Sequence, residues 1–250
     1  MRIAHWLKKY ADELLDLIYP RVCFGCKVKL PICSGIYLCE KCLNKVKYLC
    51  PPFCHFCGIP VGENIFEEKT SRCIECTSQR YYFKKGYTAS IYDNLIKECI
   101  HSLKYNSHTY LGSTLGTVMS EYAKKFIPVE DIDLIVPVPL HWKKLRDRGF
   151  NQSVVLGSVL AEKTGVMFVS KGISRTKSMP SQVRLSRNER MHNLEGAFCV
   201  TKPEYFVNKR ILLVDDVFTT GATMNECARA LIKSGAKEVS AFSLARGVTH

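Results

Sequence analysis

Apolar residues along this chain follow two different spacings, and the alternation between them predicts where strands and helices lie. Short apolar runs without polar alternation, such as residues 211–214, are typical of parallel strands that are buried on both faces. Other segments repeat apolar residues every three or four positions, which predicts helices with one buried face. We expect strands at 85–92, 132–136, 167–169, 209–214 and 238–244, and helices at 95–105, 110–126, 151–164 and 224–235.

This order of elements predicts an α/β fold, a doubly wound parallel sheet flanked by helices. In such sheets ligands bind beyond the carboxyl ends of the strands, so the segment after Val136 should face the segment after Val214. We assign residues 81–250 to this domain. A helix at 1–20 and a small module at 21–80 precede it.

The segment 1–20 carries one apolar stripe at helical spacing. Its polar face is mixed in charge, which favours a helix that docks on protein over one that lies on a membrane surface. Charged residues interrupt every run that could serve as a signal peptide or a membrane span, so we expect a cytoplasmic protein. The stripe consists of Ile3, Trp6, Leu7, Tyr10, Ala11, Leu14, Leu15 and Ile18.

The chain is strongly basic, with 36 Lys and Arg against 23 Asp and Glu and a net charge of +13 over 250 residues. This excess must be balanced by solvent, by phosphate ligands or by a polyanionic partner. The charge alone does not choose among these three.

Cysteines are concentrated near the N-terminus, where ten of the thirteen lie between Cys23 and Cys76. Eight of them form four Cys-x-x-Cys pairs. Twelve residues separate the first pair from the second and fifteen separate the third from the fourth, a spacing close to that of zinc ribbons. The pairs are Cys23 and Cys26, Cys39 and Cys42, Cys54 and Cys57, and Cys73 and Cys76. We therefore expect about two structural zinc ions in the module 21–80, whose core should be separate from that of the sheet.

Two other interpretations of the cysteines are weaker. Disulfides require an oxidising compartment, and a redox-active Cys-x-x-Cys usually occurs once rather than in four copies. Sequential pairing would put one ion on the first two pairs and another on the last two, while a cross-braced arrangement stays open. Cys33 and Cys50 receive no role.

An acidic pair and a small turn follow the most apolar strand. We expect that strand to end at Asp215 and Asp216, and the turn Thr219, Thr220, Gly221, Ala222 and Thr223 to lead into a helix. A helix N-terminus favours a phosphate group, and carboxylates beside it suit sugar hydroxyls. The sequence therefore predicts a phosphosugar site.

Three alternatives for this stretch are less favourable. Receiver domains also contain an LVDD segment but need about 100 further residues, and a P-loop requires a GxxxxGK[ST] segment that is absent here. An ordinary helix capped by Thr219 or Thr220 needs no acidic pair. The segment VDDVFTTGAT resembles the phosphoribosyl pyrophosphate (PRPP) motif of type I phosphoribosyltransferases, although Phe218 is bulkier than the residue that is often found there.

Two basic segments complete the predicted site. The segment PVPLHWKKLRDRGFNQS, which begins at Pro137, resembles the pyrophosphate loop of type I phosphoribosyltransferases, and a solvated basic helix start is the alternative. A polar segment between Ser174 and Ala197 has the place of the family's flexible catalytic hood, which we expect to be ordered by PRPP. The resemblance implies PRPP contacts from Val138, Pro139, Lys143, Lys144 and Arg146, and hood contacts from Arg184, Arg187 and Arg190.

The whole chain resembles the ComF family. The resemblance rests on the cysteine pairs, IKECIHSLKY, the basic segment, SQVRLSRNERMHNLEGAF and LLVDDVFTTGAT, in that order. It implies a cytoplasmic bacterial protein linked to DNA uptake in natural competence. It also implies a type I phosphoribosyltransferase fold and Mg²⁺-dependent transfer from PRPP, with Asp215 and Asp216 holding the ribose.

The resemblance leaves the acceptor and the oligomeric state open. The alternative to an enzyme is a non-catalytic competence factor that senses PRPP and binds single-stranded DNA, with competence proteins as further partners. Aromatic residues among basic ones at 80–85 would suit base stacking, but the start of a core strand explains them equally well.

Overall fold

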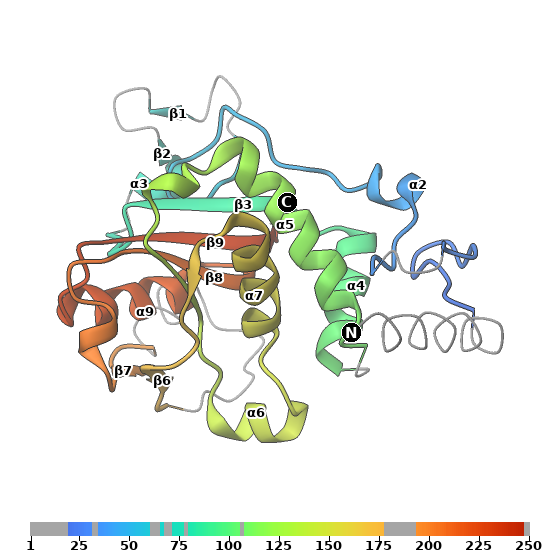
Figure 1. Cartoon of the computed structure of the whole chain (residues 1–250). Helices are drawn as coiled ribbons and strands as arrows, with labels where there is room; N and C mark the ends of the chain where they lie inside the picture. Colours follow the sequence, from blue (N-terminus) through green and yellow to red (C-terminus); the bar gives the residue numbers. More distant parts are fainter. Residues whose placement is uncertain are drawn as a thin grey trace.

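The centre of the molecule is a five-stranded sheet in which all neighbouring strands are parallel, with the order β3-β9-β8-β4-β5 (Figure 1). The computed structural model describes residues 20–31, 35–60, 66–67, 72–77, 80–105, 108–177 and 194–247. The sheet strands are β3 (Lys85–Ile91), β4 (Leu134–Pro137), β5 (Met167–Phe168), β8 (Arg210–Phe218) and β9 (Glu238–Arg246). The predicted α/β fold is therefore confirmed.

Helices cover both faces of this sheet. One face packs on α4, α5 and α7, and the other packs on α9 (Figure 1). The helices are α2 (Glu40–Leu43), α3 (Ile74–Thr77), α4 (Asn94–Tyr105), α5 (Leu111–Phe126), α6 (Trp142–Arg148), α7 (Gln152–Thr164) and α9 (Ala222–Lys233), with 3-10 turns at Val129–Asp131 and Pro203–Tyr205. Within the described residues, no helix has the length and apolarity that a membrane crossing needs.

The apolar run that predicted β8 is buried on both sides. Leu212 and Val214 contact the α4–α5–α7 side, whereas Ile211 and Leu213 contact the α9 side. This alternation follows from the two-residue side-chain period of a strand. Covered on both faces, the run needs no polar positions.

The structure corrects the expected end of this strand. β8 does not stop at Asp215 but continues to Phe218, which pairs with Arg246 of β9. The ring of Phe218 is 2% exposed and meets Phe83 edge to face, so an apolar anchor after the acidic pair prolongs the ladder. The acidic pair therefore lies within the strand.

The structure contains a helix and a hairpin that the sequence did not predict. The segment after β4 contains the helix α6, which begins at the N-cap His141 and ends at Gly149. The segment before β8 contains the antiparallel hairpin of β6 (Ile173–Arg175) and β7 (Phe198–Val200). Residues 178–193, which include Arg184, Arg187 and Arg190, lie outside the described residues, as does the predicted helix up to residue 19.

The described residues of the cysteine-rich region do not form a core of their own. Cys23 and Cys42 belong to the same hydrophobic cluster as α4, α5 and α7, whereas Cys54 and Cys57 belong to the cluster beneath α9. The expectation of a separate core is therefore wrong. Short strands β1 (Phe66–Glu67) and β2 (Arg72–Cys73) form the only sheet pairing within the described part of residues 61–80.

Candidate phosphosugar site and metal centres

The acidic pair of β8 is held by residues from two helices. Ser153 Oγ donates a hydrogen bond to Asp215 Oδ1 at 2.7 Å, and Gln152 Nε2 donates to Asp216 Oδ1 at 3.2 Å. Lys104 of α4 forms an ion pair with the other oxygen of Asp216. Asp216 is 4% exposed, so its negative charge is balanced inside the protein.

The two carboxylates differ in their surroundings. The pKa of Asp215 is raised to about 7, chiefly by burial and also by the adjacent Asp216, and the Ser153 hydrogen bond opposes both. Burial acts to lower the pKa of Lys104, but the ion pair with Asp216 outweighs burial and the pKa is raised. Near neutral pH, Asp215 can therefore gain or lose a proton, while Lys104 stays charged.

The turn after β8 leads into α9 as expected, but its cap is a glycine. Gly221 has a φ of 78° and makes no side-chain cap hydrogen bond, while Thr220 Oγ1 accepts a long hydrogen bond from Ala222 N at 3.4 Å. A Cβ at Gly221 would lie 2.5 Å from Phe218 Cζ, so the tight packing also requires glycine. Thr219 is exposed, Thr220 and Thr223 are partly exposed, and Ala222 is buried. Gly221 itself offers no capping side chain, so the start of α9 is suited to a phosphate beside the long contact from Ala222 N to Thr220 Oγ1.

The predicted basic segment divides between the site and the surface. Burial lowers the pKa of Lys144, and the nearby charges of Arg175, Arg148 and Lys104 lower it further. Lys143 and Arg146 instead lie over the ring of Trp142, at 5.6 and 5.3 Å from its centroid. Val138 is buried and bonded to Val214 and Asn151, and Pro139 lines a pocket of about 520 Å³ beside α6.

Sequence reasoning did not select five of the residues that surround the acidic pair, namely Lys104, Arg148, Gln152, Ser153 and Arg175. Arg148 donates to Gln152 Oε1 at 2.5 Å, which continues the chain of contacts from Asp216. The Nε of Arg175 has no hydrogen-bond partner among the described residues, although it is buried. The motifs IKECIHSLKY and GFNQS contain Lys104, Gln152 and Ser153. Nothing in the residues of these motifs indicates that they contact β8. Four cations, Lys104, Lys144, Arg148 and Arg175, therefore influence one another beside two acids.

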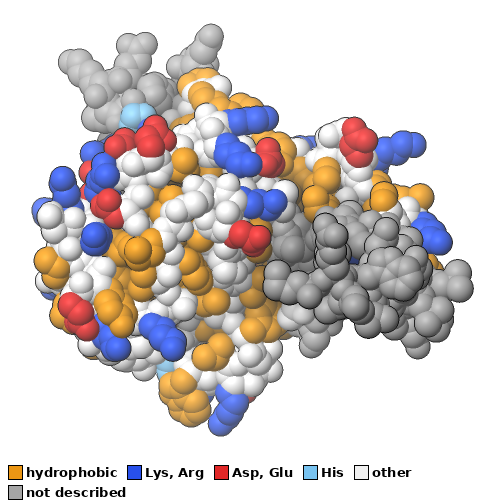
Figure 2. Space-filling view, viewed as in Figure 1, with side chains coloured by type: hydrophobic (Ala, Val, Ile, Leu, Met, Phe, Trp, Pro, Cys, Tyr) orange, Lys and Arg blue, Asp and Glu red, His pale blue; other side chains and the backbone are white. Residues whose placement is uncertain are grey.

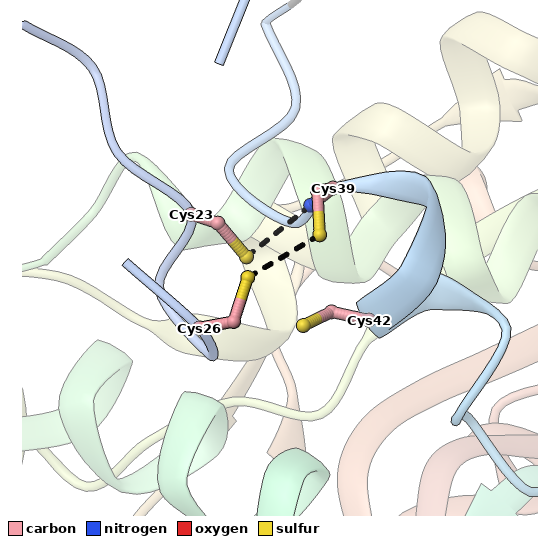
Figure 3. Close-up of side chains that lie close together, drawn as sticks. All are labelled: Cys23, Cys26, Cys39 and Cys42. Carbon is pink, nitrogen blue, oxygen red and sulfur yellow. Dashed lines mark hydrogen bonds between the residues drawn. The ribbon is translucent and has the colours of Figure 1, made fainter. Parts of the chain in front are cut away.

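The eight paired cysteines form two clusters with sequential pairing. One contains Cys23, Cys26, Cys39 and Cys42, and the other Cys54, Cys57, Cys73 and Cys76. Within each cluster all sulfur atoms lie within 4.8 Å of one another, and in the first they point toward a common centre (Figure 3). The cross-braced arrangement is thereby excluded. Cys50 is exposed and belongs to neither cluster, and Cys33 lies outside the described residues.

Both clusters fit a tetrahedral zinc ion. Zn–S bonds of about 2.3 Å place the sulfurs of a tetrahedron about 3.8 Å apart. Cys26 and Cys39 Sγ are 3.5 Å apart, and Cys57 and Cys73 Sγ are 3.6 Å apart. Backbone N–H groups point at cluster sulfurs, from Cys39 to Cys23 and from Cys73 to Cys54, each at 3.3 Å. Such donors stabilise thiolates, which are the form that binds zinc.

Comparisons with known protein families also divide the chain into a cysteine-rich N-terminal part and a sheet domain. The family model of the phosphoribosyl transferase domain matches residues 150–248, and that of the double zinc ribbon domain matches residues 14–77. DNA utilization protein YhgH of Salmonella typhi is 30% identical over 240 residues, covering 92% of this chain and 99% of its own. Competence protein F of Haemophilus influenzae is 29% identical, covering 90% and 96%. An adenine phosphoribosyltransferase structure from Thermoanaerobacter pseudethanolicus is 16% identical, covering 56% and 83%, with a TM-score of 0.35.

The parallel sheet, the acidic pair in β8 and the family matches define a phosphoribosyltransferase-like protein with a double zinc ribbon. The chain belongs to the ComF family.

Proposed function

We propose that this chain binds PRPP with Mg²⁺ and transfers its phosphoribosyl group to an acceptor. The observation that carries the proposal is the arrangement of two carboxylates, four cations and a helix N-terminus that begins at Gly221, at the carboxyl end of β8. Cations that repel one another in a partly buried place are favoured when an anion binds among them. PRPP carries a phosphate at one end, a pyrophosphate at the other and two hydroxyls between them.

Each part of the site has one role in this proposal. The turn from Thr219 to Thr223 would bind the 5′-phosphate, and Asp215 and Asp216 would accept hydrogen bonds from the ribose hydroxyls. Lys144, Arg148 and Arg175 would face the pyrophosphate and stabilise its charge as the bond to the ribose breaks. Mg²⁺ bound together with PRPP would offset the negative charge of the pyrophosphate.

A calorimetric titration with PRPP and Mg²⁺ tests the proposal. Changing Asp215 and Asp216 together to Asn keeps their size but removes two charges. A hydrogen bond to a charged group contributes about 1.5–3 kcal/mol, so we expect affinity to fall roughly tenfold or more per residue. Equal affinity in the wild type and in a double variant with an unchanged fold would refute the phosphosugar site.

We also propose a second function, binding of single-stranded DNA in the DNA-uptake context that the names of the relatives suggest. The observation in its favour is α6, where Trp142 is 56% exposed and Lys143 and Arg146 lie over its ring. The aromatics at 80–85 favour it less, because Phe83 is buried and Tyr81 stacks on Phe56. On the face shown in Figure 2, basic side chains are dispersed among acidic and apolar ones.

The DNA proposal is tested on α6 itself. Changing Trp142 to Ala should weaken binding of a single-stranded oligonucleotide, and the affinity of the wild type should fall steeply with salt. PRPP affinity should stay constant, because Trp142 lies outside the acidic pair's contacts. Unchanged DNA affinity in this variant would count against α6 as the DNA surface.

A further inference from the structure

Lys104 is the contact of the acidic pair that comes from farthest away in the sequence. It lies near the end of α4, and its ammonium group pairs with Asp216 Oδ2. The side chains of Lys104 and Asp216 are 20% and 6% exposed. Both charges are therefore largely removed from water.

The packing of α4 determines where Lys104 points. Ile96, Ile100 and Leu103 are at most 1% exposed and fix the helix against the sheet. On the same helix, Leu95 lies close to Gly25, beside the first cysteine cluster. Because α4 is held at both of these contacts, its last turn presents Lys104 to β8 in a defined position.

Stability does not account for this ion pair. Removing two charges from water costs about as much as their attraction returns, so a buried pair is often no more stable than apolar residues of the same size. Asp216 also accepts from Gln152, which Arg148 holds in turn. Both oxygens of this carboxylate are thus fixed in direction before any ligand binds. Such preorganisation is typical of binding sites, because it lowers the cost of ordering groups when the ligand arrives.

We propose that Lys104 is a positioning residue of the PRPP site, which holds the Asp216 carboxylate in the orientation that accepts a ribose hydroxyl. This inference rests on the proposed binding of PRPP. Lys104 acts through Asp216, and its charge matters more than its shape.

Three variants test the role by calorimetric titration with PRPP and Mg²⁺. Lys104→Met removes the charge and should weaken affinity at least tenfold. Lys104→Arg keeps the charge and should stay within about threefold of the wild type. Lys97→Met, on an exposed position of the same helix, should bind as the wild type does. If Lys104→Met binds PRPP as tightly as the wild type, the inference is wrong while the proposed function stands.

A double-mutant cycle covers the case in which Lys104→Met folds poorly. Removing both charges in Lys104→Met with Asp216→Asn leaves no unpaired buried charge, so this variant should fold. If Lys104 acts through Asp216, adding Lys104→Met to Asp216→Asn should change PRPP affinity less than twofold. A tenfold further loss in that background would overturn the positioning role. Absence of PRPP binding by the wild type would instead refute the proposed function.

Discussion

The two cysteine clusters have the same four ligands and the same pairing, yet they are joined to the sheet in different ways. All cysteines of the second cluster are buried, whereas Cys26 of the first is exposed and Cys39 is partly exposed. The first contacts helix side chains, and the second contacts strand backbone. The difference indicates that the first ribbon is docked on a finished domain, while the second completes that domain.

The first cluster meets α5 through side-chain hydrogen bonds. Tyr37 N donates to Thr114 Oγ1 at 2.8 Å, and Ser113 Oγ donates to Gly35 O at 2.6 Å. The rings of Tyr37 and Tyr110 add a contact at 4.3 Å between centroids. Contacts of this kind orient a module without supplying the secondary structure of its neighbour.

The second cluster and the segment before it cover the open edge of β3. Gly86 N donates to His55 O at 2.6 Å, Leu49 N to Ala89 O at 3.0 Å, and Ile91 N to Lys47 O at 3.1 Å. On its other side β3 pairs with β9, and on the covered side Tyr48 forms an isolated bridge with Ser90. An uncovered edge strand is a template for aggregation, so this segment protects the sheet.

The largest expected effect is loss of the second cluster. We expect Cys57→Ser to prevent formation of a stable sheet, because it removes one ligand of a buried zinc site. The backbone O of Cys57 accepts hydrogen bonds from both Thr88 and Arg246, so loss of order at this site would reach the sheet. Light scattering and far-ultraviolet circular dichroism after expression measure this. Cys50→Ser, at an exposed cysteine outside both clusters, is the matched control and should fold normally. A folded Cys57→Ser protein would remove the distinction between the clusters.

Loss of the first cluster should be milder. We expect Cys26→Ser to lower zinc content from about two to about one per chain while the sheet persists, since Cys26 is exposed and its module contacts helices. A loss on the order of 3 kcal/mol would lower the melting temperature by about 6–12 °C. Metal analysis with thermal melting checks this, and complete unfolding would show that both clusters are integral to the domain.

The sequence predicted the sheet better than it predicted the site. Strands such as β8 have a local signal, a buried apolar run, and the cysteine pairs have a local spacing. The edge cover of β3 by residues 47–57 has no such signal, because backbone hydrogen bonds leave no trace in residue type. The separate core was therefore inferred from composition alone, and the packing of Cys23 and Cys54 into different clusters contradicts it.

The same reasoning explains the site residues that were missed. Asp215 and Asp216 adjoin a recognisable turn, so one segment of sequence suffices to predict them. Lys104 is separated from Asp216 by more than a hundred positions and joins it only through the packing of α4 on the sheet. Lys143 and Arg146 were chosen for charge, but α6 directs them to Trp142, an orientation that depends on where the helix begins.

The third prediction extends the comparison to the acidic pair. Asp216 has a counterion from α4, the helix that contacts the first ribbon, whereas Asp215 has a hydroxyl partner and a pKa of about 7. In the unfolded chain its pKa is about 4, so between pH 4 and 7 the folded state holds more protons and stability falls as pH rises.

Asp215→Asn removes this titration. The full shift corresponds to at most about 4 kcal/mol, and we expect about half of it because the two carboxyls are coupled. We compare the melting temperature of the variant minus that of the wild type at two pH values. This difference should be about 4–8 °C larger at pH 8 than at pH 5. Ser153→Ala serves as a comparison that keeps the carboxyl. An equal difference at both pH values would show that Asp215 is not the titrating group.

The smallest effect concerns the link between the second ribbon and the phosphate turn. Arg246 donates to Cys57 O at 3.2 Å and lies over the ring of Phe218 at 5.0 Å, and that ring fills the space beside Gly221. Arg246→Lys keeps the charge but loses the planar stacking, which contributes about 0.5–1 kcal/mol. We therefore expect PRPP affinity to weaken about two- to fivefold with zinc content unchanged, as measured by calorimetry and metal analysis. Arg229→Lys, on α9 but paired with Glu226, is the control and should bind PRPP normally. If both variants weaken binding equally, the second ribbon stabilises the sheet without reaching the turn.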